Sequence, residues 1–331
     1  MEVRDVKTAK TKKIIGRIAI ILAVVILLAG LLPACALHIF INRHCDYKGV
    51  ETEKYPMQGI YQAADYGLEE EIHYLDTSDD ETIWVSEIAV EKPKAVILYL
   101  SGIVQPSVTY FYGHAKMMRE QGIASFLIEV RAHGNSTGKQ LGLGFTELWD
   151  VWAVMDYLKS QEAYRDVPVI IQGVSMGGAV ALNAFGQLED IDACIAMSAY
   201  VSFEDELDYI MQGLKLPKFI RDYENLWFRA VLRLNFDRTS LEVLNPYVQI
   251  LHANGRPVLL IACEDDTSVA VENTCDIYMM NHDAEVWIRD SWEHFIVKNC
   301  DFAHVEEDTE YCEYILSWIR KNVLNKADSK E

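Results

Sequence analysis

The chain has 331 residues, half of them hydrophobic, and a formal net charge of −20. Residues 1–17 carry +4, so the remainder carries about −24, which argues against nucleic acid as a partner and against the globular part lying on an anionic lipid surface. The seven cysteines show no C-x-x-C spacing, so neither a zinc motif nor a thioredoxin-like motif is indicated.

An uncharged run, residues 18–41, follows this basic tail. Its 24 residues would form a helix of about 36 Å, enough to cross a hydrocarbon core of about 30 Å. The positive flank predicts an uncleaved signal anchor that crosses the cell membrane once, with the rest of the chain on the extracytoplasmic side. Two alternatives are cleavage after Ala34-Cys35-Ala36 and lipidation of Cys35 in the lipobox-like Leu32-Pro33-Ala34-Cys35.

Residues 42–65 are polar and interrupted by Gly49, Pro56 and Gly59, which predicts a stalk. Residues 70–74 and 82–90 then alternate as strands do and predict an antiparallel hairpin. Further strands are predicted at 95–100, 124–130, 167–171, 193–197, 257–262 and 284–288, and helices near 110–121, 146–160, 269–280 and 309–323. This alternation predicts an α/β fold over residues 66–325, with a mostly parallel sheet covered by helices on both faces.

The helix predicted at 146–160 has apolar residues at helical spacing, which predicts a buried stripe. Its members are Leu148, Val151, Trp152, Met155 and Leu158.

The strand at 167–171 leads into Gly173-Val174-Ser175-Met176-Gly177, and a run rich in small residues follows. A strand, G-x-S-x-G and a helix form the nucleophile turn of α/β-hydrolases. Such a tight turn would strain the backbone at Ser175 and would need glycines on both sides of it. It would also place the N–H of Met176 at a helix N-terminus, where a developing oxyanion can be held.

A serine nucleophile needs a base, and the base needs an acid that fixes its tautomer. In this fold the chain order is serine, acid, histidine. The acid belongs after the strand at 257–262, where the residues alone do not choose between Glu264, Asp265 and Asp266. The histidine belongs after the strand at 284–288, where His294 is favoured over His304 on chain order.

About 60 residues separate the strands at 193–197 and 257–262, more than one crossover needs. We expect a helical cap at about 203–240 over Ser175, with large apolar side chains such as Trp227 and Phe228 binding the substrate. An acidic cluster opens this segment and favours either a solvated first helical turn or a site for a substrate amine. Its members are Glu204, Asp205, Glu206 and Asp208.

These motifs resemble the serine α/β-hydrolases over about residues 68–323, particularly bacterial membrane-anchored members near the serine aminopeptidase and monoacylglycerol lipase-like group. The family's oxyanion loop, His-Gly-x, appears as Ser101-Gly102-Ile103, which implies that the backbone N–H groups of Ile103 and Met176 form the oxyanion hole. The family's Asp-x-Arg-Gly-His-Gly-x-Ser appears as residues 129–136. Its Gly-x-x-Asp-x-x-Val appears as residues 263–269, which selects Asp266 as the acid.

We therefore expect a membrane-anchored serine hydrolase that cleaves carboxylic esters of short to medium acyl chains through an acyl-enzyme. Ser175 would attack, His294 would carry the proton and Asp266 would orient His294. No metal or organic cofactor is implied, and the expected partners are a small ester and, through the N-terminal helix, a membrane. Alternatives are an aminopeptidase-like enzyme and a catalytically idle hydrolase fold that serves as an interaction module.

Export would permit disulfides among five cysteines. They are Cys45, Cys263, Cys275, Cys300 and Cys312.

Overall fold

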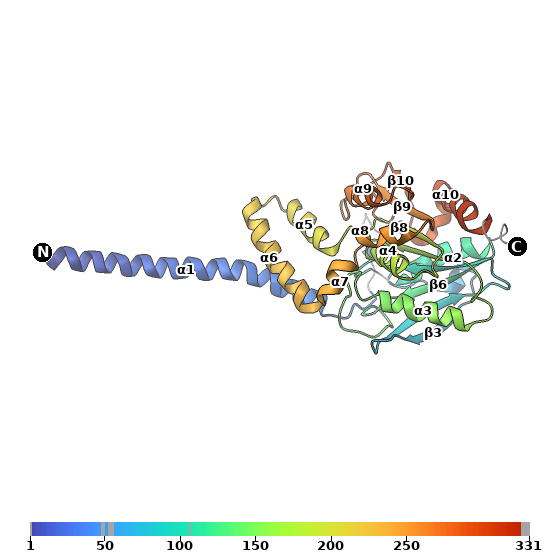
Figure 1. Cartoon of the computed structure of the whole chain (residues 1–331), viewed down its shortest axis with the longest axis horizontal. Helices are drawn as coiled ribbons and strands as arrows, with labels where there is room; N and C mark the ends of the chain where they lie inside the picture. Colours follow the sequence, from blue (N-terminus) through green and yellow to red (C-terminus); the bar gives the residue numbers. More distant parts are fainter. Residues whose placement is uncertain (1, 48–49, 52–55, 106, 326–331) are drawn as a thin grey trace.

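The computed structural model describes residues 2–47, 50–51, 56–105 and 107–325. Figure 1 shows one long N-terminal helix, α1 (Glu2–Ile41), projecting from an α/β body that holds the rest of the chain. A pair of helices, α5 (Phe203–Gly213) and α6 (Lys218–Asn235), lies between the body and the free part of α1. The molecule therefore has three parts. We call α1 the anchor helix and the α5–α6 pair the cap, after the roles expected from the sequence, and the rest the body.

The body is built on an eight-stranded sheet with the order β10-β9-β8-β7-β5-β6-β4-β3. Strands β5 to β10 pair in parallel except where β6 meets β4, and β3 pairs with β4 as the antiparallel hairpin that the sequence predicts. The strands are β3 (Glu71–Asp76), β4 (Thr82–Ile88), β5 (Ala95–Leu100), β6 (Ile123–Glu129), β7 (Val169–Val174), β8 (Ala193–Met197), β9 (Val258–Cys263) and β10 (Glu285–Arg289). A separate antiparallel pair joins β1 (Val50–Glu51) and β2 (Pro56–Met57).

Helices cover both faces of this sheet, which confirms the predicted fold class. Along β5, Val96, Leu98 and Leu100 point into one core and the residues between them point into the other, which is why the strand reads as an unbroken apolar run. The first core is covered by α3 (Leu148–Ser160), α4 (Met176–Gln187) and α9 (Val271–Met280). The second is covered by α2 (Tyr112–Arg119) and α10 (Thr309–Ile319).

The predicted buried stripe of α3 is correct at four positions and wrong at Trp152. Leu148, Val151, Met155 and Leu158 are buried, whereas Trp152 is 43% exposed and stacks on Trp149 with ring centroids 5.7 Å apart. Helical spacing places Trp152 at the edge of the stripe, where the described part of the body covers it only partly.

The segment after α1, expected to be a polar stalk, contacts the body in the part that the structure describes. Ile41 is fully buried, and its carbonyl accepts a hydrogen bond from the N–H of Leu141 at 2.8 Å. Cys45 is buried and pairs with the 132–134 loop: its N–H donates to the Ala132 carbonyl at 2.7 Å, and its carbonyl accepts from the Gly134 N–H at 2.8 Å. Residues 48–49 and 52–55 lie outside the described residues.

The seven cysteines all lie within the described residues, and none of them forms a disulfide in this structure. The disulfides that export would permit among Cys45, Cys263, Cys275, Cys300 and Cys312 are therefore not formed here. Cys194, at the start of β8, is fully buried as a small core residue.

Candidate active site

Ser175 lies in the turn between β7 and α4, at the carboxyl end of the sheet. Its backbone has φ 59° and ψ −124°, a strained combination for a residue with a side chain. Its N–H donates to the Met197 carbonyl at 2.8 Å, which fixes the turn to the end of β8. The predicted strained nucleophile turn is thus present, and Met176 is the first residue of α4, where backbone N–H groups have no helical partner.

The loop after β5 lies directly against this turn. A Cβ added to Gly177 would lie 2.3 Å from the Leu100 carbonyl oxygen and 2.6 Å from that of Ser101, so only glycine allows this approach. A Cβ added to Gly102 would lie 3.2 Å from the Cβ of Ser175. The predicted oxyanion loop, Ser101-Gly102-Ile103, is therefore a direct neighbour of Ser175.

Two side chains hold this loop in place. The hydroxyl of Tyr110 accepts a hydrogen bond from the Gly102 N–H at 3.2 Å. Nε2 of His133 accepts one from the Val104 N–H at 3.1 Å. His133 is buried, and burial lowers its pKa to about 4, so the ring is neutral and can accept at Nε2 while Nδ1 donates to the Arg131 carbonyl. His133 is thus a structural residue of the loop.

His294 and Asp266 form a buried pair. Asp266 follows β9 and His294 follows β10, and His294 Nδ1 lies 2.7 Å from Asp266 Oδ2. The other carboxylate oxygen, Oδ1, accepts from the N–H groups of Ser268 at 2.7 Å and Val269 at 3.3 Å. Burial raises the pKa of Asp266, but the hydrogen bond and charge of His294 and these two amides outweigh it and hold the pKa below its usual range.

The backbone brings His294 and Ser175 to the same strand end. Met197 accepts the Ser175 N–H, and the next residue, Ser198, donates its hydroxyl to the His294 carbonyl at 2.9 Å. Ser198 was missed by the sequence reasoning, although its position directly after a predicted strand was a usable signal. Serine, acid and histidine thus come from the carboxyl ends of β7, β9 and β10, in the chain order expected.

The alternative candidates for the acid and the base are more exposed than Asp266 and His294. Glu264 and Asp265 are exposed, whereas Asp266 is 5% exposed. His304 lies in the 3-10 turn Phe302–Glu307 with half of its side chain exposed, and stacks on Tyr66 with ring centroids 5.7 Å apart. The geometry therefore favours His294 and Asp266 over their competitors.

The two side chains expected to bind substrate are used in helix packing. Trp227 lies against the anchor helix, because a Cβ added to Gly30 would lie 2.0 Å from Trp227 Nε1. Phe228 is buried and faces the space between α5 and α6. Among the described contacts, neither touches Ser175, Asp266 or His294. The sequence could not foresee this, since the partner of Trp227 lies almost 200 residues earlier.

The acidic cluster at the start of the cap divides into two kinds of residue. Glu204 is exposed and pairs with Arg229, Asp205 accepts from the hydroxyl of Ser202, and Asp208 accepts from Asn225 and Gln212. Glu204 and Asp205 belong to a solvated first turn of α5, and Asp208 lies in the next turn with its two amide partners. Glu206 differs: it is 7% exposed, and its Oε2 accepts no hydrogen bond from any described residue.

The environment of Glu206 links it to the Asp266–His294 pair. Burial, followed by the charge of Asp266, raises the pKa of Glu206 from 4.5 to about 8. The charge of Asp266 acts on Glu206, so this cap carboxyl is electrostatically coupled to the candidate acid. With a pKa of about 8, Glu206 is mostly protonated at neutral pH.

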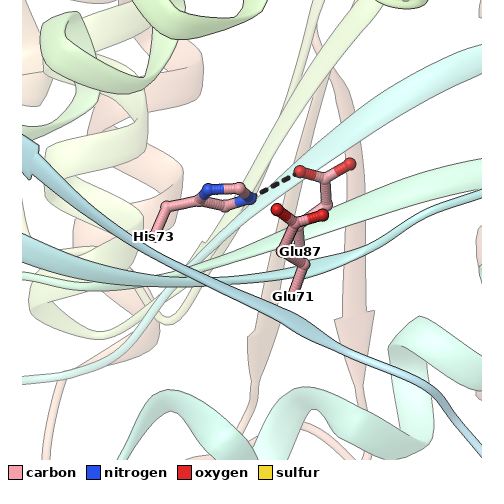
Figure 2. A group of neighbouring side chains, drawn as sticks. All are labelled: Glu71, His73 and Glu87. Atoms are coloured by element: carbon pink, nitrogen blue, oxygen red, sulfur yellow. Dashed lines mark hydrogen bonds and ion pairs between the residues drawn. The ribbon is translucent and has the colours of Figure 1, made fainter.

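A second cluster of titratable residues lies far from Ser175, on the hairpin at the opposite edge of the sheet. Figure 2 shows His73 of β3 pointing toward Glu87 of β4, with Glu71 beside them; His73 Nε2 and Glu87 Oε2 are 2.7 Å apart. Glu87 also accepts hydrogen bonds from the hydroxyls of Tyr157 and Tyr164. Because its two oxygens already have these partners, Glu87 serves as a packing centre of the hairpin.

Comparison with known proteins agrees with this arrangement. The family described as serine aminopeptidase, S33, matches residues 91–233. The Bacillus subtilis protein YqkD, itself described as uncharacterized, is 28% identical over 172 residues, which are 50% of this chain and 53% of YqkD. This chain thus spans about half the length of that relative.

Solved structures share the fold. The Pyrococcus furiosus esterase Pf2001 has a TM-score of 0.62 at 19% identity, and the match covers 85% of this chain and 99% of the esterase. The Pyrococcus horikoshii acylaminoacyl peptidase has a TM-score of 0.56 at 14% identity, covering 77% of this chain and 42% of the peptidase. An esterase and a peptidase are thus both similar in fold to this body.

Proposed function

We propose that the chain is a membrane-anchored serine hydrolase that cleaves carboxylic esters through an acyl-enzyme. The match of residues 91–233 to the serine aminopeptidase family and the fold shared with an esterase support this proposal. The observation that carries the proposal is the 2.7 Å hydrogen bond between His294 and the buried carboxylate of Asp266. This bond makes Nδ1 the donor to Asp266, so Nε2 is the ring nitrogen that would take the proton of Ser175. The backbone N–H groups of Ile103 and Met176 would hold the oxyanion.

The reaction follows from the chemistry of these groups. Ser175 attacks the ester carbonyl as Nε2 of His294 accepts its proton, and the resulting imidazolium then protonates the departing alcohol. A water molecule attacks the acyl-enzyme in the same way and releases the acid. Asp266 keeps its charge throughout, because His294 and two amides already hold its pKa low.

Ester hydrolysis is tested with p-nitrophenyl esters of increasing acyl length and with aminoacyl anilides, using full-length protein in detergent micelles. We expect butyrate to octanoate esters to be cleaved faster than acetate, since each buried CH₂ gains about 0.8 kcal/mol, and anilides to be poor substrates. The Ser175→Ala variant is the negative control. Ester turnover that persists undiminished in this variant would refute the proposed site.

Glu206 favours a second function, cleavage of substrates that carry a free amine. A buried carboxyl with an unused oxygen, electrostatically coupled to the candidate acid, is the kind of group that would bind an ammonium ion, and it would ionise as it did so. The same assay separates the two functions. Anilide cleavage that exceeds ester cleavage and disappears in Glu206→Gln, but not in Glu204→Gln, would establish the peptidase in place of the esterase.

The proposed location, in a membrane with the body on the extracytoplasmic side, rests on the anchor helix. α1 contains a segment, Lys12–Ile41, that is long and apolar enough to cross a membrane. With Lys12, Lys13 and Arg17 at its start, this segment would leave the body on the extracytoplasmic side. Protease added outside spheroplasts should then digest the body, and a high-salt wash should leave the protein in the membrane fraction.

A further inference from the structure

The anchor helix has a free part and a packed part. From Lys12 to Ala29 its side chains are exposed all round, whereas from Gly30 onward a stripe at helical spacing is buried. The buried members of that stripe are Gly30, Ala34, Leu37 and Ile41. The free part is the portion available to lipid, and the packed part belongs to the fold.

Helix α6 crosses α1 at the junction of these two parts (Figure 1). The hydroxyl of Tyr223 donates to the Ile26 carbonyl at 2.7 Å, and the ring of Trp227 covers Gly30. At the other end of α6, the Asn235 amide bonds to Nδ1 of His38 at 3.1 Å and accepts from Asn42 at 2.6 Å. The cap is therefore fixed to α1 along four helical turns.

The position of Ile26 places part of the cap at membrane depth. A hydrocarbon core of about 30 Å takes up about 20 helical residues, so a span that starts after Lys13 reaches Pro33 and one that starts after Arg17 reaches Leu37. Ile26, where Tyr223 bonds, lies about 10 Å inside the outer boundary in the first case and about 16 Å inside it in the second. The cap residues around Tyr223 would thus lie beside lipid.

The cap exposes apolar side chains at this level. The turn between α5 and α6 and the adjoining helix ends expose Ile210, Leu214, Leu216 and Phe219, with Phe219 73% exposed. One exposed face of α6 continues from Phe219 through Leu226 and Ala230 to Leu234, at spacings of seven, four and four residues. We call residues 209–221 the cap tip.

The charge of the cap tip is opposite to that of the body. It contains Lys215, Lys218 and Arg221 and no acidic residue, in a chain whose net charge is −20. Lys218 pairs with Asp222, the residue directly after the tip, at 2.8 Å, so Lys215 and Arg221 are the cations offered to lipid headgroups. Cations beside exposed apolar side chains suit the headgroup region of an anionic leaflet, where each contributes about 1 kcal/mol. Tyr223 and Trp227 are of the residue types enriched at membrane interfaces.

We propose that the cap tip is a second membrane contact, inserted into the outer leaflet that α1 crosses, so that the candidate site takes its ester from the bilayer. The inference rests on the proposed anchoring and hydrolase function. The acidic body stays off the lipid surface, and the tip alone provides the contact. The α1–α6 contact makes the two membrane elements one rigid unit.

Docking of the tip is tested without reference to activity. The full chain is placed in nanodiscs of phosphatidylcholine with a minority of phosphatidylglycerol, and a fluorophore is attached at Leu216→Cys. Met279→Cys on α9 is the control, because Met279 is also apolar and is more exposed, at 63% against 36% for Leu216. Both are made in a background where Cys35, Cys275, Cys300 and Cys312 are serine, because the remaining cysteines are buried.

A lipid that carries a spin label near the top of its acyl chain should quench the Leu216 fluorophore several-fold more than the Met279 fluorophore. Equal quenching at the two sites would overturn the proposal. So would a Leu216 fluorophore shielded from aqueous iodide but not quenched by the spin-labelled lipid, because a protein surface such as a second copy of the chain would then cover the tip.

Delivery of substrate is tested with the double variant Leu216→Glu/Phe219→Glu. Its turnover of water-soluble p-nitrophenyl butyrate should be unchanged, whereas turnover of a long-chain ester dissolved in the nanodisc should fall several-fold. Equal loss on both esters, or on neither, would contradict entry from the bilayer. Absence of any Ser175-dependent turnover in the unmodified chain would instead refute the hydrolase function, while the quenching experiment would still decide the docking.

Discussion

The carboxylate that orients His294 is the residue whose role is most sharply defined by its contacts. Asp266→Asn should lower turnover about 10³-fold or more, because Nδ1 of the imidazole loses the acceptor that fixes its tautomer. Asp265→Asn, one residue earlier and exposed, should change turnover little. Steady-state kinetics on p-nitrophenyl butyrate would measure both, and equal losses would mean that the loop rather than one carboxylate is disturbed.

Glu206 should make the protein less stable as pH rises. Its pKa is about 8 when folded and 4.5 ordinarily, so the folded state holds the proton more tightly than the unfolded state does. The contribution of Glu206 to the free energy of unfolding is then fully present below about pH 4.5 and is lost as pH rises through about 8. The drop in unfolding midpoint between about pH 5 and about pH 9 should therefore be smaller in Glu206→Gln than in the unmodified protein.

Glu204→Gln provides the control for this measurement, since Glu204 lies on the same helix but forms an exposed ion pair with Arg229. It should keep the pH dependence of the unmodified protein. A Glu206→Gln variant that loses as much stability over the same interval would contradict a buried protonated carboxyl.

Sequence reasoning reached most site residues because strand ends and chain order constrain them strongly. Ser175 follows from the G-x-S-x-G motif between a predicted strand and a predicted helix, and His294 follows from its place after the last predicted strand. The choice of Asp266 among three adjacent carboxylates needed the family motif. In the structure, burial distinguishes Asp266 from the exposed Glu264 and Asp265, and burial depends on tertiary contacts that the sequence does not display. Glu206 differs from its helix neighbours for the same reason.

At the scale of the elements, the crossing of α1 and α6 depends on the absence of a side chain at Gly30. Gly30→Val should force Trp227 away from α1 and destabilise the cap by about 1–3 kcal/mol, the usual cost of overpacking. Gly16→Val is the matched control on the same helix, because nothing lies within 4 Å of its added Cβ. Limited proteolysis of the α5–α6 turn would show the difference as faster cleavage in the Gly30 variant alone.

The cap is the element that sequence patterns described least well. The spacing of its apolar residues predicted amphipathic helices with approximately correct bounds. The same spacing did not show that Trp227 packs against α1, and we had expected this side chain to bind substrate. Tyr223 and Ile26 are 197 residues apart, and an apolar helix face carries no sign of which distant partner will cover it. In the same way, period placed Trp152 in the α3 stripe although the body leaves it exposed.

At the scale of the whole molecule, the end of the anchor helix is a part of the hydrophobic core. Ile41→Ala should cost about 2–5 kcal/mol, because Ile41 is fully buried and the body cannot collapse around the lost methyl groups. Ile39→Ala, two residues earlier and 69% exposed, should cost much less. Chemical denaturation in detergent micelles would measure both, and equal midpoints would show that residues before 42 act only as a tether.

The contacts of the segment after α1 extend this coupling to the candidate site. Cys45 pairs with the 132–134 loop, and His133 of that loop accepts the Val104 N–H next to the predicted oxyanion loop. Anchor, cap and site are therefore connected through a short series of direct contacts. Removal of residues 1–65 should destabilise the body as well as release it from the membrane.

The central claim is that Ser175 is an activated nucleophile served by His294, and covalent labelling with a fluorophosphonate tests it most directly. The full-length protein should be labelled, and mass spectrometry should place the adduct on Ser175. Ser175→Ala should abolish labelling, His294→Ala should slow it by orders of magnitude, and His304→Ala should leave it near normal. An adduct on another residue, or normal labelling of the His294 variant together with loss in the His304 variant, would contradict the account.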